Sequence, residues 1–278
     1  MIDTHVHFWN FDPVRDNWIN EEMKIIQRDF SPEDLAPIYT GLGISGCVAV
    51  QANQNESETD FLLALADHQP LIKGIVGFTD LRSPAVEERL AYWSKFDKIK
   101  GWRHVLQAET ADFFLDASFI NGLRALKQHQ YTYDLLIYHD QLDDIIKLVE
   151  QVPDQPFVLD HCGKPNIKGG DIKSWALGIK TLASQPAVHC KISGLLTEAD
   201  WYNWTETQLF NCFDVVFENF GTERIMYGSD WPVVNLSKPY VDWFNLVKKY
   251  SSQFTESEQY AIFHDNAKRF YRLASTRS

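Results

Sequence analysis

The sequence predicts an α/β fold made of one (β/α)8 barrel of the TIM type, regular or distorted. The chain has 278 residues, close to the ~250 that one such barrel needs. Short runs of valine, isoleucine, leucine and aromatic residues recur along it. Their near-continuous hydrophobicity is typical of parallel strands that are buried on both faces. Amphipathic segments separate these runs, so we expect a single domain over residues 1–278.

The apolar runs number eight, which favours a closed barrel over an open sheet. Each run is followed by enough chain to return to the next strand through a right-handed crossover. The expected strands are residues 2–8, 46–51, 72–79, 99–106, 133–138, 156–160, 188–192 and 224–227.

The segments between the expected strands show the spacing of amphipathic helices. Residues 56–68 are the first of them, and Ser57 or Thr59 is the expected N-cap. The other expected helices are residues 85–95, 119–128, 141–151, 173–184, 205–219, 241–250 and a closing helix at 256–273.

Residues 10–34 show no regular pattern and are too long for a simple connection between a strand and a helix. The segment contains Trp18, Arg28 and Phe30. Long loops at the C-terminal face of a barrel are usually functional. We therefore expect residues 10–34 to form an active-site loop that covers the substrate.

The composition argues against several classes of partner. The net charge is −12 and the pI is about 5.2, so nucleic acid and anionic membranes are not expected to bind. No apolar stretch approaches the ~18 residues that span a bilayer. The four cysteines form no CxxC pair, which favours buried thiols over a zinc ribbon or a disulfide framework. We expect a cytoplasmic protein, monomer or homodimer, that acts on a small molecule.

Two histidines lie near the end of the first expected strand. His5 and His7 are two residues apart, so their side chains point to the same side of a strand. Paired imidazoles at a barrel mouth are a natural beginning for a divalent-metal site. For an isolated pair, ordinary buried histidines would be the better interpretation in roughly three cases of four, because histidine has only an intermediate preference for burial.

Polar residues also end the sixth and eighth strands. His161 precedes Gly163 and Pro165, which form a tight turn at the rim. Asp230 follows the eighth strand, where a carboxylate ligates a metal, accepts a proton from water, or merely caps a turn. A barrel brings the C-terminal ends of its strands to one mouth. The combination with the first strand therefore indicates a site more strongly than any one residue does.

Seven motifs, spread over nearly the whole chain, carry a resemblance to a known family. They are IDTHVHFW at 2–9, GIVGFTDL at 74–81, GWRH at 101–104, VLDHCGKP at 158–165, KISGL at 191–195, GSDWPV at 228–233 and NAKRFY at 266–271. With them the chain resembles the amidohydrolase superfamily of the amidohydrolase 2 type. The similarity is greatest to its branch of sugar lactonases, such as L-fucono- and L-rhamnono-lactonases.

The resemblance implies a (β/α)8 barrel and a role for each matched residue. His5 and His7 match the histidine pair of strand one, and His161 matches the histidine of strand six. Asp230 matches the aspartate of strand eight, which implies the general base and acid. His5, His7 and Asp230, together with His161, are thereby the expected ligands of any metal.

The chain departs from the metal-rich members of the superfamily, which carry a bridging residue on strand four and a histidine on strand five. Here strand four offers Arg103 and His104, and a guanidinium is no metal ligand. His139 lies near the end of strand five, but the sequence does not fix its register. We expect one divalent ion, zinc first because the site is rich in imidazole, or none.

The expected reaction is hydrolysis of the ring ester of a sugar-derived lactone to an aldonic acid. Asp230 and His161 are its expected catalytic residues: Asp230 moves the proton, and His161, Arg103 or a bound metal stabilises the oxyanion. Arg103, His104 and Lys191 match positions near the site of the lactonase branch and are expected to bind substrate. A salt bridge or a solvated rim charge is an equally good interpretation of Lys191 and Arg103. Trp18 and Trp231 are expected to offer faces for the sugar ring, with Trp9 and Trp102 as further candidates; one or two of the four tryptophans should contact it.

Two other functions remain open from the sequence. A metal-dependent amidohydrolase or decarboxylase on the same barrel would need a tightly held ion. A carbohydrate-binding barrel without activity would show sugar affinity and no turnover. The intact set of His5, His7, His161 and Asp230 argues against the binding protein, because such a set erodes once catalysis is lost.

Overall fold

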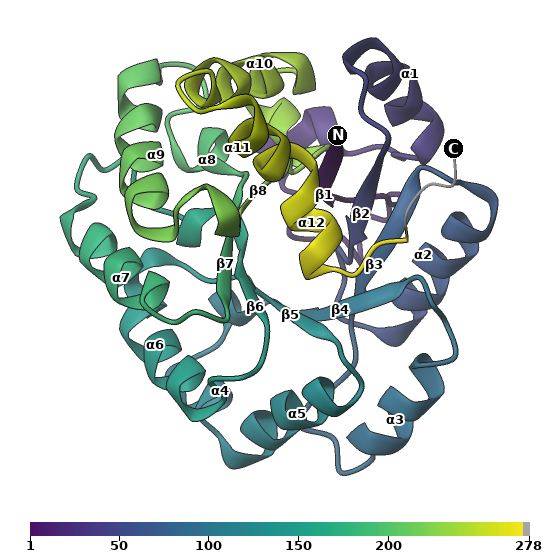
Figure 1. Cartoon of the computed structure of the whole chain (residues 1–278). Coiled ribbons are helices and arrows are strands. Elements are labelled where there is room, and N and C mark those ends of the chain that lie inside the picture. Colours follow the sequence, from purple (N-terminus) through teal and green to yellow (C-terminus); the bar gives the residue numbers. More distant parts are fainter. Residues whose placement is uncertain (275–278) are drawn as a thin grey trace.

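The computed structural model describes residues 1–274, and the last four residues of the expected domain lie outside this range. Eight parallel strands follow one another around a barrel in the order of the sequence, with helices on the outside (Figure 1). The strands are β1 (Ile2–Val6), β2 (Gly46–Val50), β3 (Ile72–Gly77), β4 (Ile99–His104), β5 (Thr132–Leu135), β6 (Phe157–Leu159), β7 (Val188–Ile192) and β8 (Ile225–Tyr227). The predicted (β/α)8 barrel and all eight predicted strands are confirmed.

The barrel closes between its first and last strands. The residues just after β8 pair with the end of β1, where Val6 and Trp231 form a parallel bridge. The main-chain nitrogen of Asp230 donates to the carbonyl oxygen of His5 at 2.9 Å, and that of His7 donates to Trp231 at 2.7 Å. These hydrogen bonds therefore close the barrel beside His5 and His7.

Helix α2 (Glu56–His68) has the predicted bounds, but its N-cap is Asn55 rather than Ser57 or Thr59. The Asn55 side chain accepts from the main-chain nitrogen of Glu58 at 2.8 Å. Ser57 donates to Asn55, and Thr59 is hydrogen-bonded to Phe78, so neither is free to cap. The other predicted helices are α3 (Val86–Trp93), α5 (Ala117–Gln128), α6 (Leu142–Gln151), α7 (Lys173–Ala183), α9 (Glu206–Phe220) and α10 (Tyr240–Ser251), and two short helices are added, α4 (Ala111–Phe114) and α8 (Leu195–Glu198).

The predicted closing helix consists of three parts. Helix α11 (Glu256–Tyr260) and helix α12 (Asn266–Phe270) are joined by a π-helical turn at Ala261–Asp265. Helix α12 lies across one opening of the barrel in Figure 1. Its apolar residues complete the core inside the barrel, which consists of Ile2, Val48, Val50, Val76, Val158, Met226, Ala267, Phe270, Tyr271 and Leu273. The opening of the barrel covered by α12 is filled with apolar side chains, so a site can form only at the opposite opening.

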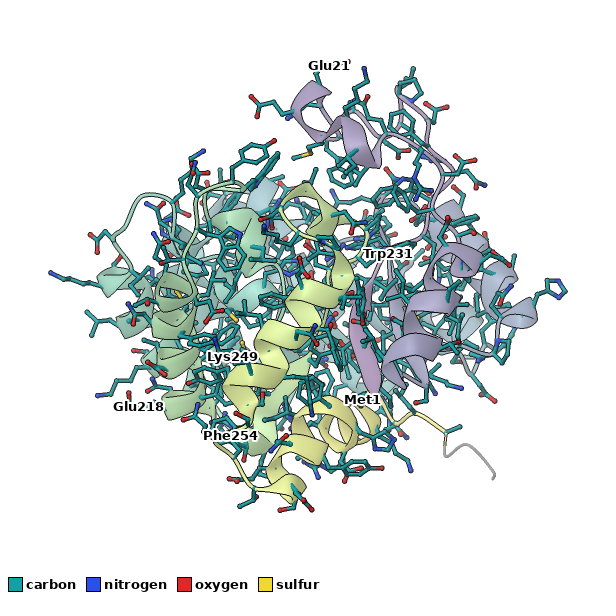
Figure 2. The ribbon with its side chains drawn as sticks, turned by 90° about the horizontal axis from the view of Figure 1, so that it is seen from above. Met1, Glu21, Glu218, Trp231, Lys249 and Phe254 are labelled. Atoms are coloured by element: carbon teal, nitrogen blue, oxygen red, sulfur yellow. The ribbon has the colours of Figure 1, made fainter. Side chains whose placement is uncertain are left out.

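Residues 10–34 contain a 3-10 helix at Glu21–Ile26 and the start of helix α1 (Pro32–Leu42). Helix α1 was not predicted, because Pro37 and Gly41 obscure its pattern. The segment is closed at its base by an antiparallel bridge between Trp9 and Phe30. Figure 2 shows Glu21 at the end of the molecule opposite Phe254.

The four cysteines are buried and free, as predicted. They stand in or beside the strands and helices as small apolar side chains. Among residues 1–274 there is no helix with the length and apolar character needed to cross a membrane.

Candidate active site

A cavity of about 460 Å³ opens at the C-terminal ends of the strands. His7, Arg103, His161 and Asp230 line it from four different strand ends, and Trp18 lines it from residues 10–34. The remaining wall is formed by Arg15, Asn17, Ala52, Asn53, Gln54, Val105, Gln107, Ala108, Leu136, Lys164 and Val233. This is the position at which barrels of this type carry their active sites.

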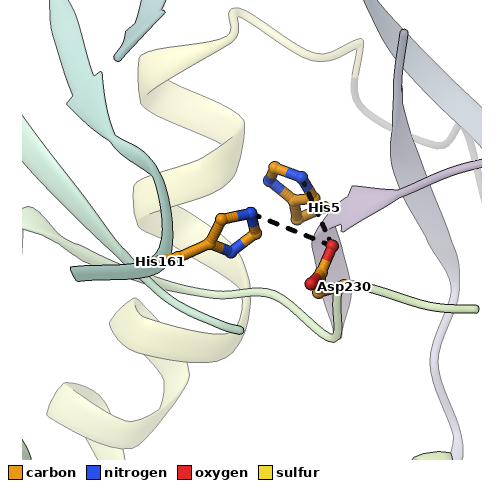
Figure 3. A group of neighbouring side chains, drawn as sticks. All are labelled: His5, His161 and Asp230. Carbon is orange, nitrogen blue, oxygen red and sulfur yellow. Dashed lines mark ion pairs between the residues drawn. The ribbon is translucent and has the colours of Figure 1, made fainter. Parts of the chain in front are cut away.

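Three imidazoles surround one carboxylate oxygen at the bottom of this cavity. The Oδ1 atom of Asp230 lies 3.4 Å from Nε2 of His7, 3.7 Å from Nε2 of His5 and 3.9 Å from Nε2 of His161. Figure 3 shows His5 and His161 directed at Asp230. All four side chains are buried, with His5 fully inaccessible. The structure thus brings together the four residues from strands one, six and eight.

Unusual backbone places two of these side chains. His161 has φ = 53° two residues after β6, and Asp230 has φ = 59° three residues after β8. A left-handed conformation costs a residue with a Cβ about 1–2 kcal/mol. Such outliers persist where the surrounding structure holds them, often at functional sites. At Asp230 the holding contact is its main-chain hydrogen bond to His5.

The segment after β7 fits closely around His161. The Oγ atom of Ser193 lies 2.9 Å from Nδ1 of His161. Gly194 has φ = 68°, and a Cβ added there would lie 2.5 Å from the same Nδ1 atom. His161 can therefore occupy its position only because residue 194 is a glycine.

The tautomer of His7 follows from its partner. Its Nδ1 atom lies 2.8 Å from the carbonyl oxygen of Val50, which only accepts, so in the neutral ring Nδ1 carries the hydrogen and Nε2 presents a lone pair. The Nε2 atom of His5 lies 3.1 Å from the Nε2 atom of His7. Two ring nitrogens this close need a proton or a cation between them.

The donor atoms fit a single divalent cation. One ligand atom each from His5, His161 and Asp230 lies within 4.8 Å of the others, and the lone pair of His7 faces the same space. Two or three imidazoles with one carboxylate are the ligands of many zinc sites with an open position. The set fits zinc better than magnesium or calcium, which prefer oxygen.

A layer of buried charges lies beneath the histidines. The Nζ atom of Lys191 is 2.5 Å from Asp134 and 2.9 Å from Asp160, and all three side chains are inaccessible. Asp160 also lies 3.3 Å from Nδ1 of His5 and 3.2 Å from Nη1 of Arg103. This layer fixes the ring of His5 from below.

The electrostatics of the site favour neutral imidazoles beside an ionised carboxylate. Burial lowers the pKa of His5 and of His161 well below the usual value. Burial raises the pKa of Asp230, but the neighbouring imidazoles of His161 and His7 outweigh this effect, so that the pKa lies below the ordinary value. At neutral pH Asp230 is a charged acceptor, and His5 and His161 present lone pairs.

Two residues expected to bind substrate reach the cavity wall. Trp18 lines it and is partly exposed. Arg103 lines it too, but its guanidinium is engaged: Nη1 donates to Asp160, and Nη2 donates to the carbonyl oxygen of Gln51 at 2.5 Å. Whether either residue touches a substrate stays a prediction.

The other residues expected near substrate lie behind the wall. Lys191 is enclosed by Asp134 and Asp160. His104 turns away to Glu109, 2.9 Å from its Nε2 atom, and packs against the ring of Phe113.

The remaining tryptophans and His139 are likewise absent from the cavity wall in the described part of the chain. Trp231 packs between Phe8 and Phe30, and the indole of Trp9 donates to Arg28. Trp102 packs on Trp93 and Tyr131, and His139 begins a 3-10 turn after β5.

Sequence reasoning missed a polar wall built from residues 10–34. Asp16 is buried and holds the guanidinium of Arg15 at 2.8–2.9 Å and the amide of Asn53 at 2.9 Å. This clamp fixes the loop against the segment after β2. The run Arg15-Asp16-Asn17-Trp18 could have indicated this wall, because four consecutive polar or aromatic residues in one loop need partners elsewhere in the structure.

The comparisons with known proteins agree with this geometry. A model of the amidohydrolase family matches residues 2–273. The chain is 36% identical over 284 residues to L-fucono-1,5-lactonase of Burkholderia multivorans, covering 98% of this chain and 96% of that protein. It is 30% identical over 277 residues to L-fucono-1,5-lactonase of Burkholderia ambifaria, with coverage of 98% and 95%.

A crystal structure of an amidohydrolase from Burkholderia multivorans with bound zinc is also similar. Its TM-score is 0.95 at 36% sequence identity, and the match covers 98% of this chain and 99% of that one. The family predicted from the motifs is confirmed by the whole length of the match: the chain belongs to the amidohydrolase family.

Proposed function

We propose that the protein hydrolyses the ring ester of a sugar-derived lactone and releases the aldonic acid. The observation that carries this proposal is the Asp230 carboxylate, ionised and faced by three imidazoles at the bottom of a cavity of about 460 Å³. The names of the two Burkholderia relatives support L-fucono-1,5-lactone or a similar lactone as substrate.

The chemistry needs a base for water and an acid for the leaving oxygen. Asp230 takes a proton from water as the water oxygen bonds to the lactone carbonyl carbon. The bond from that carbon to the ring oxygen then breaks, and Asp230 returns the proton to this oxygen, which becomes a hydroxyl. An ester needs less help than an amide because an alkoxide leaves more easily than an amine.

His5, His161 and Asp230, with His7 beside them, would hold one divalent ion, zinc in the first place. When bound, the ion supplies a Lewis acid and lowers the pKa of water. Arg103 adds a fixed positive charge at the wall, where it stabilises negative charge on the carbonyl oxygen. The support for zinc is the donor set together with the zinc in the similar crystal structure.

The cavity wall suits a polyhydroxylated ring. Asn17, Asn53, Gln54 and Gln107 supply amide donors and acceptors for hydroxyl groups, and Trp18 supplies an aromatic face. This mixture of amides and one indole would discriminate among sugars by hydroxyl configuration.

The test is acid release, followed with a pH indicator, from a panel of aldonolactones including L-fucono-1,5-lactone and L-rhamnono-γ-lactone. We expect release well above the uncatalysed rate. Each reaction is repeated after chelation and after addition of zinc. Activity lost with chelator and restored by zinc supports the metal-bound form, whereas activity unchanged by chelator supports a lactonase that needs none. No release from any lactone by protein that contains stoichiometric metal would reject the lactonase in favour of another amidohydrolase or a decarboxylase.

A further inference from the structure

Four successive residues after β6 have left-handed backbone. The φ angles are 53° at His161, 54° at Cys162, 68° at Gly163 and 48° at Lys164. Residues with a Cβ visit this region singly and rarely in runs. Three hydrogen bonds hold this turn: the nitrogen of Lys164 donates to His161 at 2.9 Å, the indole of Trp175 to Cys162 at 2.7 Å, and the thiol of Cys162 to Lys191 at 3.4 Å.

The left-handed turn directs some of its side chains into the core and others into the cavity. Cys162 is fully buried in the core. His161 and Lys164, the first and fourth residues, both line the cavity. A right-handed continuation from β6 would change these directions, so the left-handed run is what puts a lysine next to the catalytic histidine.

Lys164 differs from the other cations of the cavity wall in how its charge is engaged. Arg15 is held through two nitrogens by the buried Asp16. Arg103 is held by the buried Asp160 and by a carbonyl oxygen. Lys164 pairs with the carboxylate of Glu198, 3.3 Å from its Nζ atom, and here both side chains are partly exposed.

An ammonium group has three donors, and one of them suffices for Glu198. The ring of Tyr138 lies on another side of Nζ, with its centroid 5.2 Å away. Among the described residues that line the cavity, Lys164 is therefore the cation with the greatest capacity to bind an anionic group of a ligand.

We propose that Lys164 is a catalytic residue that binds the lactone carbonyl oxygen as negative charge develops on it, and then binds the product carboxylate. This inference rests on the proposed lactone hydrolysis. The substrate is neutral and the product is an anion, so a cation at this place stabilises the transition state more than the ground state. The chain carries a net charge of −12, which makes a local cation all the more necessary for an anion to form there.

Glu198 is the exchange partner in this arrangement. It lies on α8, whose first turn follows Gly194 and Ser193, the residues that surround His161. When the carbonyl oxygen becomes negative, it competes with Glu198 for the Nζ donors. Removal of the charge of Glu198 should consequently strengthen the binding of the product.

The test compares Lys164→Met with Lys168→Met, using wild-type activity on the best lactone as reference. Lys168 lies four residues further along the same loop, is exposed, and lines a surface groove instead of the cavity. We expect Lys164→Met to lower kcat/KM by about 100-fold, mostly in kcat, and to weaken inhibition by the aldonate at least about tenfold. Lys168→Met should leave both unchanged, and Lys164→Arg should recover part of the loss.

Glu198→Gln provides a second arm that does not depend on the folding of Lys164→Met. It should lower the inhibition constant of the aldonate severalfold. An unchanged aldonate constant in Glu198→Gln, or a kcat/KM of folded Lys164→Met within about threefold of wild type, overturns the role of Lys164 while leaving the lactonase proposal intact. A wild-type enzyme that hydrolyses no lactone overturns both.

Discussion

Asp230 contacts His5 twice, once through its main chain and once through its side chain. Its main-chain nitrogen donates to the carbonyl oxygen of His5 at 2.9 Å, and its carboxylate lies 3.7 Å from the imidazole of the same residue. The first contact closes the barrel and the second forms the site. Because the backbone contact survives a change of side chain, the chemistry of Asp230 can be removed without opening the barrel.

Asp230→Asn should therefore abolish activity in a folded protein. Asparagine has the same shape and tolerates φ = 59°, but it takes no proton from water. We expect kcat/KM to fall by at least about 100-fold with an unchanged circular dichroism spectrum and melting temperature. The exposed Asp171→Asn serves as control. Activity within tenfold of wild type would show that another group is the base.

Gly194→Ala should displace His161. The new Cβ would lie 2.5 Å from the ring nitrogen, in addition to the strain at φ = 68°. Gly170→Ala is a matched control, because residue 170 has φ = 77° and no atom within 4 Å of the added Cβ. Both variants should lose about 1 kcal/mol of stability from the backbone. Only Gly194→Ala should also lose most of its kcat/KM, and equal activities of the two would contradict the close fit around His161.

Lys191→Met should destabilise the protein strongly. It leaves Asp134 and Asp160 buried without their shared counter-charge, and breaking a buried pair costs about 3–5 kcal/mol. Urea unfolding measures the loss. The double variant Lys191→Met/Asp134→Asn should recover part of it, since one of the two carboxylates is then neutral. Tyr271→Phe, which removes only a hydroxyl donor to Asp134, should cost about 1 kcal/mol. A similar small loss in Lys191→Met would mean that the two carboxylates protonate at little cost.

His189 should make the protein less stable in acid. Burial, with smaller contributions from Arg224 and Arg269, lowers its pKa to about 4, and its Nδ1 atom is buried without a hydrogen-bond partner. The pKa of His189 in the folded protein lies below the unfolded value of about 6.5, so the neutral ring contributes its full share to the free energy of unfolding above pH 6.5. As the pH falls from 6.5 to about 4, this contribution is lost, and the free energy of unfolding decreases by at most about 3 kcal/mol.

The pH dependence is measured as the free energy of unfolding in urea between pH 7 and pH 4. His189→Leu removes the titration while keeping an apolar contact with Phe270. Its stability should fall less steeply over this interval than that of the wild type. Parallel curves for the two proteins would show that His189 is not the group responsible.

The strands and the histidines on them were accessible from the sequence because their signals are local. A buried parallel strand is an apolar run wherever its neighbours are, and alternation along β1 directs His5 and His7 to one side. Barrel closure then brings His161 and Asp230 to the same mouth by topology alone. No distance between residues had to be known.

The buried charges were not accessible, because their meaning depends on partners distant in the chain. Asp134 lies between Tyr133 and Leu135 in β5, and no neighbouring residue in the sequence predicts its ion pair with Lys191. Conversely, Lys191 was expected either to bind substrate or to form a salt bridge, and only the register of β5, β6 and β7 puts two carboxylates around it. Gly163 and Pro165 predicted a tight turn after β6, but the left-handed backbone of residues 161–164 was not accessible, since only Gly163 favours it.

The seam between β1 and the residues after β8 sets the time at which a nascent chain acquires its site. His5 and His7 leave the ribosome before their partner Asp230, which follows on the order of tens of seconds later. Until then the histidines are a loose pair without their carboxylate, and β1 has no second neighbour on its open edge. A divalent ion held jointly by His5, His161 and Asp230 would thus be taken up only after residue 230 has been made.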